Sequence, residues 1–235
     1  MSKPPFHFKQ FAVAQGKCAM KVNTDGVLLG AWAEIGKAKN ILDIGTGTGV
    51  IALMMAQKNQ TAMIDAIDID KDAFAQAGEN FLGSLWSKRL FAYHVSLQNY
   101  SPDRQYDLII TNPPYFIDDF KTEDHQKNIA KHSITLSYEE LIIGIARLLS
   151  AEGEAYMVLP IFNLPLFESM AMNKKLFVVK LTEVIAVEGK SPYLVLIKLA
   201  RSQKEYIKDC MIIQNAENLY TQQYKTLTKD FYLKF

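Results

Sequence analysis

Residues 112–115, Asn-Pro-Pro-Tyr, carry groups that could hold and activate an amino group. The side-chain oxygen of Asn112 and the backbone carbonyl of Pro113 are acceptors, and proline contributes no competing N–H. Two acceptors can bind both hydrogens of a planar NH₂ group, which draws the nitrogen lone pair out of conjugation and makes the amine nucleophilic without a general base. The Tyr115 ring offers a face on which a base can stack. Because Pro113 and Pro114 also end an apolar run, a plain strand stop is the alternative.

A glycine-rich segment, Asp-Ile-Gly-Thr-Gly-Thr-Gly at 43–49, follows a short apolar run. Glycine lets the backbone turn sharply and approach a ligand closely. The dinucleotide fingerprint needs a third glycine at position 50, where this chain has Val50. The spacing therefore favours a nucleoside ligand without a pyrophosphate. The candidate ligand-binding residues of this segment are Asp43, Gly45, Thr46, Gly47 and Gly49.

Asp68 ends the next apolar run, about twenty residues after the glycines, where an acid can accept hydrogen bonds from both ribose hydroxyls. Asp70 competes for this role because it lies on the same side of an extended chain. Asp70 directly precedes the helical pattern 71–82, however, and suits a helix N-cap better. We therefore assign the ribose to Asp68.

The elements that must position these residues alternate between strand and helix. Strands are predicted within 39–47, 61–70, 89–95, 106–114 and 154–160, and helices over 50–58 and 71–82. A polar loop is predicted over about 116–136. After it a further helix begins with Ser137 as N-cap and Glu140 completing a capping box, and this helix is predicted to end on Gly153. This alternation predicts a mostly parallel sheet with helices on both faces, and the ligand crevice of such a sheet lies at the carboxyl ends of its strands.

The end of the chain changes pattern. Runs at 175–189 and 191–202 predict an antiparallel hairpin at the sheet edge, 206–214 a short strand, and 220–235 an aromatic-rich helix. We divide the chain into an N-terminal extension with an entrance helix (1–36), a core (37–201) and a C-terminal extension packed on the core (202–235).

Charge is distributed unevenly along the chain. The net charge is +4 over residues 1–40, −7 over 41–189 and +4 over 190–235, which favours a polyanion bound by the ends, or else reflects ordinary surface lysines. The aromatic segment 6–11 either contacts that polyanion or staples the N-terminus. The two tryptophans and the Met54–Met55 pair are expected in the core. No apolar run reaches membrane-spanning length, Cys18 and Cys210 suggest neither a disulfide nor a metal site, and we expect a cytoplasmic protein.

Three further stretches carry a family resemblance: 21–33 (KVNTDGVLLGAWA), 112–116 (NPPYF) and 131–142 (KHSITLSYEELI). Together with the glycine segment and Asp68 they resemble the bacterial tRNA(Val) adenine-37 N6-methyltransferases, a branch of the class I S-adenosylmethionine-dependent methyltransferases. The resemblance covers nearly the whole chain. It implies a Rossmann-like α/β fold with a seven-stranded, mostly parallel sheet whose last strand is antiparallel, S-adenosylmethionine as cofactor, and tRNA as partner.

The resemblance also implies individual roles. Thr24 and Asp25 would lie near the methionine end of the cofactor, although from the sequence either could simply cap the helix that follows. Related enzymes have an aspartate after the third strand that binds the adenine amino group, but this chain has Ser96 there, so a hydroxyl or a backbone group would take that role. His132 could contact the substrate or belong to loop structure.

The leading hypothesis is therefore methyl transfer to the N6 amino group of an adenine in tRNA, adenine-37 of tRNA(Val) by resemblance. An anticodon-loop base is single-stranded and can be splayed into a pocket at low cost. The alternative is N5-methylation of a glutamine in a protein such as a release factor, because that amide also presents a planar NH₂. An inactive RNA-binding module is less consistent with the intact acids and glycines, and a nicotinamide dehydrogenase conflicts with Val50.

Overall fold

In the computed structural model, residues 4–114 and 136–234 are described. Tyr115, His132 and the loop predicted at 116–136, apart from Leu136, lie outside these residues. The main sheet contains β3 (Asn40–Ile44), β4 (Met63–Asp68), β5 (Leu90–His94), β6 (Tyr106–Thr111), β7 (Leu149–Pro160), β8 (Phe177–Val187), β9 (Leu194–Ala200) and β10 (Ile207–Gln214). The helices are α1 (Thr24–Trp32), α2 (Val50–Lys58), α3 (Lys71–Leu82), α5 (Tyr138–Leu148), α6 (Leu164–Asn173) and α7 (Gln222–Thr228).

The strand order across the sheet is β10-β8-β9-β7-β6-β3-β4-β5, and of these strands only β9 runs antiparallel to its neighbours. The chain starts in the middle with β3, proceeds outward to β5 and then returns to β6 on the other side of β3. The carboxyl ends of β3 and β6 therefore border the point where strand order reverses, which is where open α/β sheets bind ligands.

The predicted strand number of seven is wrong by one, because the described part of the sheet has eight strands. Strand β10 pairs in parallel with β8 from Ile207 to Gln214 and takes the edge that the hairpin of β8 and β9 was expected to form. Residues of the predicted C-terminal extension thus continue the sheet itself. The α/β class and the antiparallel last strand of the seven-stranded core are confirmed.

Local sequence signals explain most helix starts. Helix α3 begins after Asp70, whose carboxylate accepts hydrogen bonds from the backbone N–H groups of Asp72 and Ala73, as predicted. Helix α5 begins with the predicted capping box between Ser137 and Glu140.

The predicted end of α5 at Gly153 is wrong, because α5 stops at Leu148 and β7 starts at Leu149. Gly153 lies inside β7, in the stretch between Leu149 and Glu154 where the pairing with β6 shifts its register. A Cβ at this position would lie 2.8 Å from the carbonyl oxygen of Tyr106, so the glycine permits a close approach of two strands. Helix α7 covers seven residues, fewer than the predicted terminal helix.

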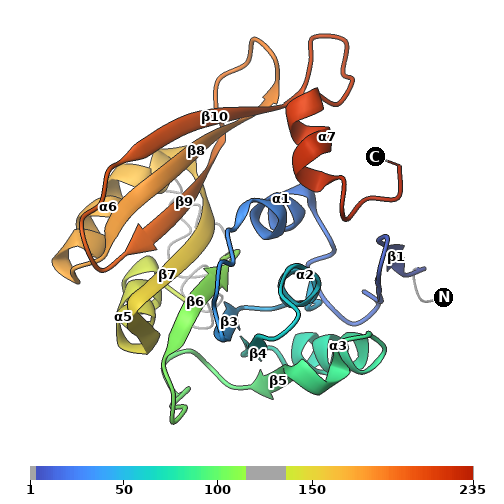
Figure 1. Ribbon diagram of the computed structural model, residues 1–235, viewed down its shortest axis with the longest axis vertical. Coiled ribbons are helices and arrows are strands. Elements are labelled where there is room, and N and C mark those ends of the chain that lie inside the picture. Colours follow the sequence, from blue (N-terminus) through green and yellow to red (C-terminus); the bar gives the residue numbers. More distant parts are fainter. Residues whose placement is uncertain (1–3, 115–135, 235) are drawn as a thin grey trace, which may run out of the picture.

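Helices cover both faces of the sheet (Figure 1). Helices α1 and α2 pack over one face around a core that includes Leu29, Leu53 and Met54, and α5 and α6 pack over the other around Ile145 and Phe167. The tryptophans and the Met54–Met55 pair are buried, as expected.

The two ends of the chain meet on one side of the molecule (Figure 1). The short hairpin β1 (Phe6–His7) and β2 (Ala12–Val13) brings Phe8 onto Tyr232, with ring centroids 6.0 Å apart. The backbone N–H of Lys9 donates to the carbonyl of Phe231 at 2.8 Å. Because Phe8 and Phe11 are buried, the aromatic segment 6–11 staples the N-terminus to the C-terminal segment.

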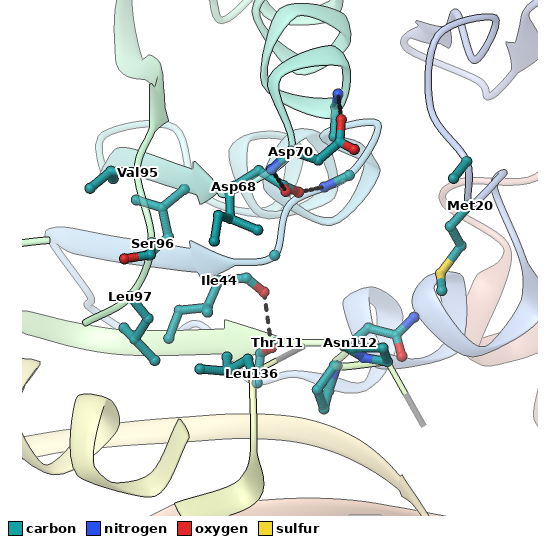
Figure 2. Close-up of a pocket in the computed structure, with 18 of the residues that line it drawn as sticks. Met20, Ile44, Asp68, Asp70, Val95, Ser96, Leu97, Thr111, Asn112 and Leu136 are labelled. Carbon is teal, nitrogen blue, oxygen red and sulfur yellow. Dashed lines mark hydrogen bonds between the residues drawn. The ribbon is translucent and has the colours of Figure 1, made fainter. Parts of the chain in front are cut away.

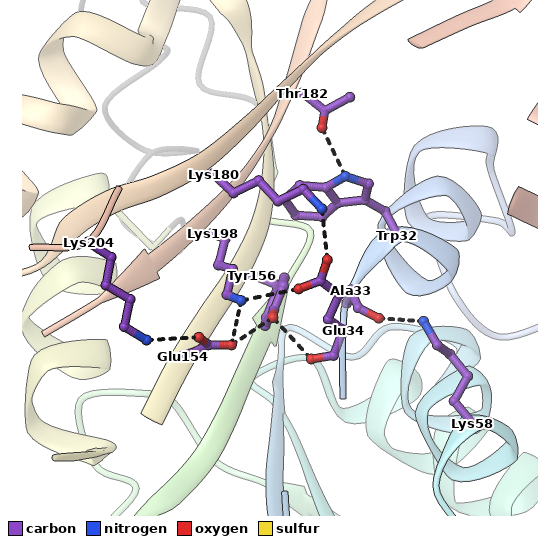
Figure 3. Close-up of polar contacts among 10 residues, drawn as sticks. All are labelled: Trp32, Ala33, Glu34, Lys58, Glu154, Tyr156, Lys180, Thr182, Lys198 and Lys204. Carbon is purple, nitrogen blue, oxygen red and sulfur yellow. Dashed lines mark hydrogen bonds and ion pairs between the residues drawn. The ribbon is translucent and has the colours of Figure 1, made fainter. Parts of the chain in front are cut away.

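The end of α1 is fixed to the sheet by a charged network (Figure 3). Glu34 pairs with Lys180 of β8 and Lys198 of β9, and Lys198 also pairs with Glu154 of β7. Lys58 from α2 donates to the last carbonyls of α1, including that of Ala31 at 2.8 Å. These contacts lie at the opposite end of α1 from the ligand edge of the sheet.

Among the helices that the structure describes, each is too short or too polar to cross a membrane.

Candidate active site

A cavity of about 340 Å³ lies at the carboxyl ends of β3, β4, β5 and β6. Figure 2 shows Asp68, Ser96 and Asn112 arranged around it, each from the end of a different strand. Of the predicted site residues that the structure describes, the lining contains Gly45, Gly47, Asp68, Ser96, Asn112, Pro113 and Pro114. The lining is mostly apolar elsewhere, which suits a flat heterocycle with a few polar groups to orient it.

The glycine loop turns sharply between β3 and α2. Gly45, Gly47 and Gly49 have φ values of 68°, 55° and 80°, which only glycine adopts without strain. A Cβ on Gly45 or Gly47 would meet no atom within 4 Å, since both face the open cavity. A Cβ on Gly49 would lie 2.5 Å from Phe81 Cε1, so this glycine serves the packing of α2 against α3 and does not line the cavity.

Asp43 lies behind the loop and is 1% exposed. Its Oδ2 accepts a hydrogen bond from the Thr46 hydroxyl at 2.6 Å, which fixes the loop from inside. Its Oδ1 is buried with no partner in hydrogen-bond geometry among the described residues. Burial raises the pKa of Asp43 to about 7, against the opposing effect of the Thr46 hydrogen bond. A backbone hydrogen bond from Ala52 also opposes the shift, and Asp43 supports the loop from behind without lining the cavity.

Asp68 links the loop to the start of α3. Its Oδ2 accepts the backbone N–H of Gly47 at 2.8 Å, and its Oδ1 accepts that of Asp70 at 2.9 Å. Burial raises the pKa of Asp68, although these backbone donors oppose the shift. Each carboxylate oxygen keeps a further lone pair, so Asp68 can still accept hydrogen bonds from a ligand in the cavity.

Asn112 is placed beside the loop by the neighbouring strand. The Thr111 hydroxyl, just before it, donates to the carbonyl of Ile44 at 2.9 Å and joins the end of β6 to the end of β3. Pro113 and Pro114 then lead the chain along the cavity. The sequence did not single out Thr111, whose hydroxyl at the last position of an apolar strand was the available signal.

The start of α1 lies next to Asn112. A Cβ added to Gly26 would be 3.6 Å from Asn112 Nδ2. The N-cap of α1 is Asn23, whose side chain accepts the N–H of Gly26 at 2.9 Å. The alternative that Thr24 or Asp25 caps this helix is therefore wrong, and both residues occupy its first turn. Neither lines the cavity in the described residues.

Asp25 contacts a residue that the sequence did not indicate, Tyr193 in the turn before β9. Burial, the charge of Asp25 and a hydrogen bond to Asp25 together raise the pKa of Tyr193 to about 12, so this phenol stays protonated at neutral pH. The carbonyl of Tyr193 accepts the N–H of Ile161, directly after β7. A half-exposed aromatic ring thus stands at the same edge of the sheet as Asn112.

Ser96 lines the cavity after β5, but within the described residues its side chain makes only a long contact, accepting the N–H of Asn99 at 3.3 Å. Gln98 also lines the cavity, and its amide donates to Glu140 Oε1 at 2.9 Å. Glu140 in turn belongs to the capping box of α5. Gln98 is thereby a side-chain amide held at the cavity two residues after Ser96.

Comparison with protein families matches residues 23–175 to the methyltransferase small domain. Curated relatives named tRNA1(Val) (adenine(37)-N6)-methyltransferase are 42% identical in Flavobacterium psychrophilum, over 97% of this chain and 99% of the relative, and 43% identical in Parabacteroides distasonis, over the full length of both.

Solved structures show the same fold at low sequence identity. A protein described as a predicted O-methyltransferase from Agrobacterium tumefaciens is 14% identical with a TM-score of 0.70, covering 88% of this chain and 96% of that one. The ribosomal protein L11 methylase from Lactobacillus delbrueckii is 17% identical with a TM-score of 0.54, covering 76% and 77%.

Proposed function

Because the chain belongs to the tRNA1(Val) (adenine(37)-N6)-methyltransferase family, we propose that it methylates the N6 amino group of adenine-37 in tRNA(Val). It is a methyltransferase that uses S-adenosylmethionine and acts on an adenine of tRNA. The observation that carries the proposal is the position of Asn112, Pro113 and Pro114 at one cavity with the glycine loop and Asp68. We infer that the enzyme acts in the cytoplasm.

The cavity fits the cofactor through the groups already described. Gly45 and Gly47 leave open space where a side chain would otherwise project. Asp68 would hold the ribose hydroxyls. Asp43, Thr24 and Asp25 do not line the cavity, and their assignment to the methionine end of the cofactor rests on the family resemblance. Thr46 and Gly49 hold the loop in shape from behind. When bound, S-adenosylmethionine supplies an electrophilic methyl group on its sulfonium sulfur.

Recognition of the cofactor's adenine falls to the segment after β5. Ser96 has a free donor hydrogen, and Gln98 retains its amide oxygen as an acceptor because its nitrogen is engaged by Glu140. We assign the acceptor role for an exocyclic amine to Gln98 and a supporting contact to Ser96. Ile69, Val95 and Leu97 supply apolar surface along the same wall.

Asn112 and the carbonyl of Pro113 would accept the two hydrogens of the substrate amine. These two contacts would draw the nitrogen lone pair out of conjugation with the purine ring and make the amine nucleophilic. Pro113 and Pro114 bring no N–H that could compete for the acceptors. Tyr115, outside the described residues, is assigned to stacking on the substrate base.

The basic ends of the chain would bind the tRNA backbone. Two contacts support a joint surface: the N–H of Lys9 donates to the carbonyl of Phe231, and the Lys9 ammonium donates to the carbonyl of Lys229. The N-terminal and C-terminal basic segments, far apart in sequence, are therefore neighbours. Clustered lysines are the expected footprint for phosphates.

The test is a methyl-transfer assay with labelled S-adenosylmethionine. One reaction offers tRNA that lacks the modification, and a second offers a purified release factor. Label recovered as N6-methyladenosine, lost when adenine-37 of tRNA(Val) is replaced by guanine, is the expected result. Label in the release factor with unmodified tRNA would instead assign the acceptor site to a glutamine amide, and an absence of cofactor binding would refute the proposal as a whole.

A further inference from the structure

Residues 14–22, between β2 and the start of α1, form a strap that crosses α3 and reaches the cavity. The strap is linked to itself, because the ammonium of Lys21 donates to the carbonyls of Gln15 and Cys18 and the N–H of Val22 donates to Gln15 Oε1 at 3.1 Å. It therefore holds its shape as one loop. Among the described residues, the hydrogen bonds and the ion pair that join this loop to the rest of the protein go to α3, while Val22 at its end packs against the core.

Asn80 makes the central contact. Its Oδ1 accepts the N–H of Ala14 at 2.9 Å, and its Nδ2 donates to the carbonyl of Ala14 at 2.9 Å. The same Nδ2 also donates to the carbonyl of Thr48, in the glycine loop, at 2.8 Å. Asn80 is buried, and its bond to Thr48 is shielded from water, whereas its two bonds to the exposed Ala14 are partly buried. One side-chain amide thus joins α3, the strap and the glycine loop.

The far part of the strap forms a wall of the cavity. Cys18, Ala19 and Met20 belong to the lining, together with Gly45, Gly47 and Asp68. Figure 2 shows Met20 on the opposite side of the cavity from Val95 and Ser96. Met20 is 51% exposed although it is a large apolar residue, which fits a side chain that gains a partner when the cavity is filled.

A second contact, between Lys17 and Glu79, lies at the solvent side of the strap. Both side chains are about half exposed, at 49% and 55%, and such ion pairs contribute little. The backbone N–H of Lys17 also donates to the buried Gln76 at 3.0 Å. The buried amides of α3, and above all Asn80, therefore carry the attachment.

We propose that Asn80 is a positioning residue for cofactor binding, which ties the strap to the glycine loop so that Cys18, Ala19 and Met20 close one wall of the cavity. This rests on the proposed function only in that the cavity takes S-adenosylmethionine. Asn80 itself does not line the cavity, and no sequence motif marked it. It acts by fixing two backbone segments that do.

The first variant is Asn80→Asp, which has nearly the same shape but loses the Nδ2 donor. A carboxylate would then face the carbonyls of Ala14 and Thr48, and both hydrogen bonds would be replaced by repulsion. The dissociation constant for S-adenosylmethionine, measured by isothermal titration calorimetry, should rise about tenfold or more. The catalytic rate at saturating cofactor should change much less, because Asn112 is not displaced.

The second variant, Ala14→Pro, removes the N–H donor from the strap side and leaves the bond between Asn80 and Thr48 intact. It should weaken cofactor binding in the same direction but by less, since the strap loses its bond to Asn80 Oδ1 and keeps the one from Asn80 Nδ2 to the carbonyl of residue 14, while the glycine loop keeps its support. The matched control is Glu79→Gln, on the same helix and against the same strap. It removes the charge of the exposed ion pair but keeps an amide oxygen that can accept the long contact from Gln76, and it should change the dissociation constant by less than about threefold.

Limited trypsin digestion gives a readout that does not depend on activity, because Lys17 and Lys21 lie within the strap. In Asn80→Asp and Ala14→Pro, cleavage mapped by mass spectrometry should accelerate at these two lysines and not across the chain, and cofactor should slow cleavage in the wild type. The proposal would be overturned if either variant bound S-adenosylmethionine with the wild-type dissociation constant and was cleaved at Lys17 and Lys21 at the wild-type rate. A wild-type protein that binds no S-adenosylmethionine would instead overturn the proposed function, while cleavage of the strap would still report on Asn80.

Discussion

Asn112 stands at the end of β6, with the Thr111 hydroxyl anchoring the strand behind it and the start of α1 beside it. We assign its side chain the role of accepting a hydrogen bond from the substrate amine, and not a role in stabilising the fold. Asn112→Ala should therefore lower the single-turnover rate of methyl transfer by about 100-fold or more, as removal of a transition-state contact does. Cofactor binding, followed by calorimetry, should stay within about threefold of the wild type.

Asn112→Asp is the informative companion, because it keeps an acceptor oxygen at the same place. It should retain more activity than the alanine variant. If Asn112→Ala lost cofactor affinity as much as it lost rate, Asn112 would belong to the cofactor site and the division of roles would be wrong.

The buried carboxyl of Asp43 predicts a pH dependence of stability. Its pKa is raised from 3.8 to about 7 in the folded protein, so between these values the folded state holds a proton that the unfolded state has lost. Stability from this group is therefore greatest at low pH and falls as the pH rises towards 7. Asp43→Asn removes that dependence and keeps an acceptor for Thr46.

Without cofactor, the unfolding temperature of Asp43→Asn minus that of the wild type should therefore be larger at pH 8 than at pH 5. Taking the difference between the two proteins at each pH cancels the titration of the other groups. A difference that does not change with pH would show that Asp43 titrates normally.

At the scale of elements, the glycine loop and α2 separate ligand binding from packing. Gly47→Ala places a Cβ in the open cavity, whereas Gly49→Ala places one 2.5 Å from the ring of Phe81. Both positions have positive φ, so each alanine carries a similar backbone cost of about 1–2 kcal/mol. The two variants are thus a matched pair that differs in what the added methyl meets.

Gly47→Ala should lose cofactor affinity by about tenfold or more with a modest decrease in unfolding temperature. Gly49→Ala should lose clearly more stability, since α2 and α3 must separate or Phe81 must change rotamer. Thermal unfolding and calorimetry on both proteins decide this. Equal effects on stability would mean that the contact with Phe81 relaxes at no cost.

Local signals in the sequence predicted the elements well where the deciding interaction lies within a few residues. Asp70 caps α3 and Ser137 with Glu140 caps α5, because capping is a contact over two or three positions. Gly153 misled because its role depends on Tyr106, which lies on a neighbouring strand. Strand β10 was predicted as a short strand, but its partner β8 could not be read from a local pattern.

The parts of the site that follow directly on a strand could also be predicted from local sequence. Gly45, Gly47, Asp68 and Asn112 follow apolar strands, and parallel strands bring their carboxyl ends together. Asn80 and Tyr193 could not be predicted, because their partners are far away in the sequence: Asn80 binds Ala14 and Thr48, and Tyr193 contacts Asp25.

At the scale of the molecule, the C-terminal segment belongs to the same folded body as the core. Met211 and Ile213 of β10, with Tyr224 and Phe231, are buried in the main core cluster, and Gln57 of α2 donates to the carbonyl of Asp230 at 2.8 Å. The division into 1–36, 37–201 and 202–235 stays a prediction about function. The segments at both ends have the structural role of closing the core over α1 and α2.

The meeting of the two basic ends predicts how tRNA binding responds to salt. Lys225 and Lys229 lie on and just after α7, next to the N-terminal segment. Lys37 and Lys39 belong to the N-terminal basic segment in sequence, but they precede β3 at the amino ends of the strands, opposite the cavity and away from α7 in the chain fold. The double variants Lys225→Gln/Lys229→Gln and Lys37→Gln/Lys39→Gln remove the same charge from the two places. Both should bind S-adenosylmethionine as the wild type does.

Only the first double variant should weaken tRNA binding. The slope of the logarithm of the binding constant against the logarithm of salt concentration should become shallower by about one to two, because fewer counterions are released from the phosphates. The KM for tRNA should rise while the rate at saturating tRNA stays close to the wild type. Filter binding at several salt concentrations measures the slope, and equal slopes for the two double variants would place the tRNA on another surface.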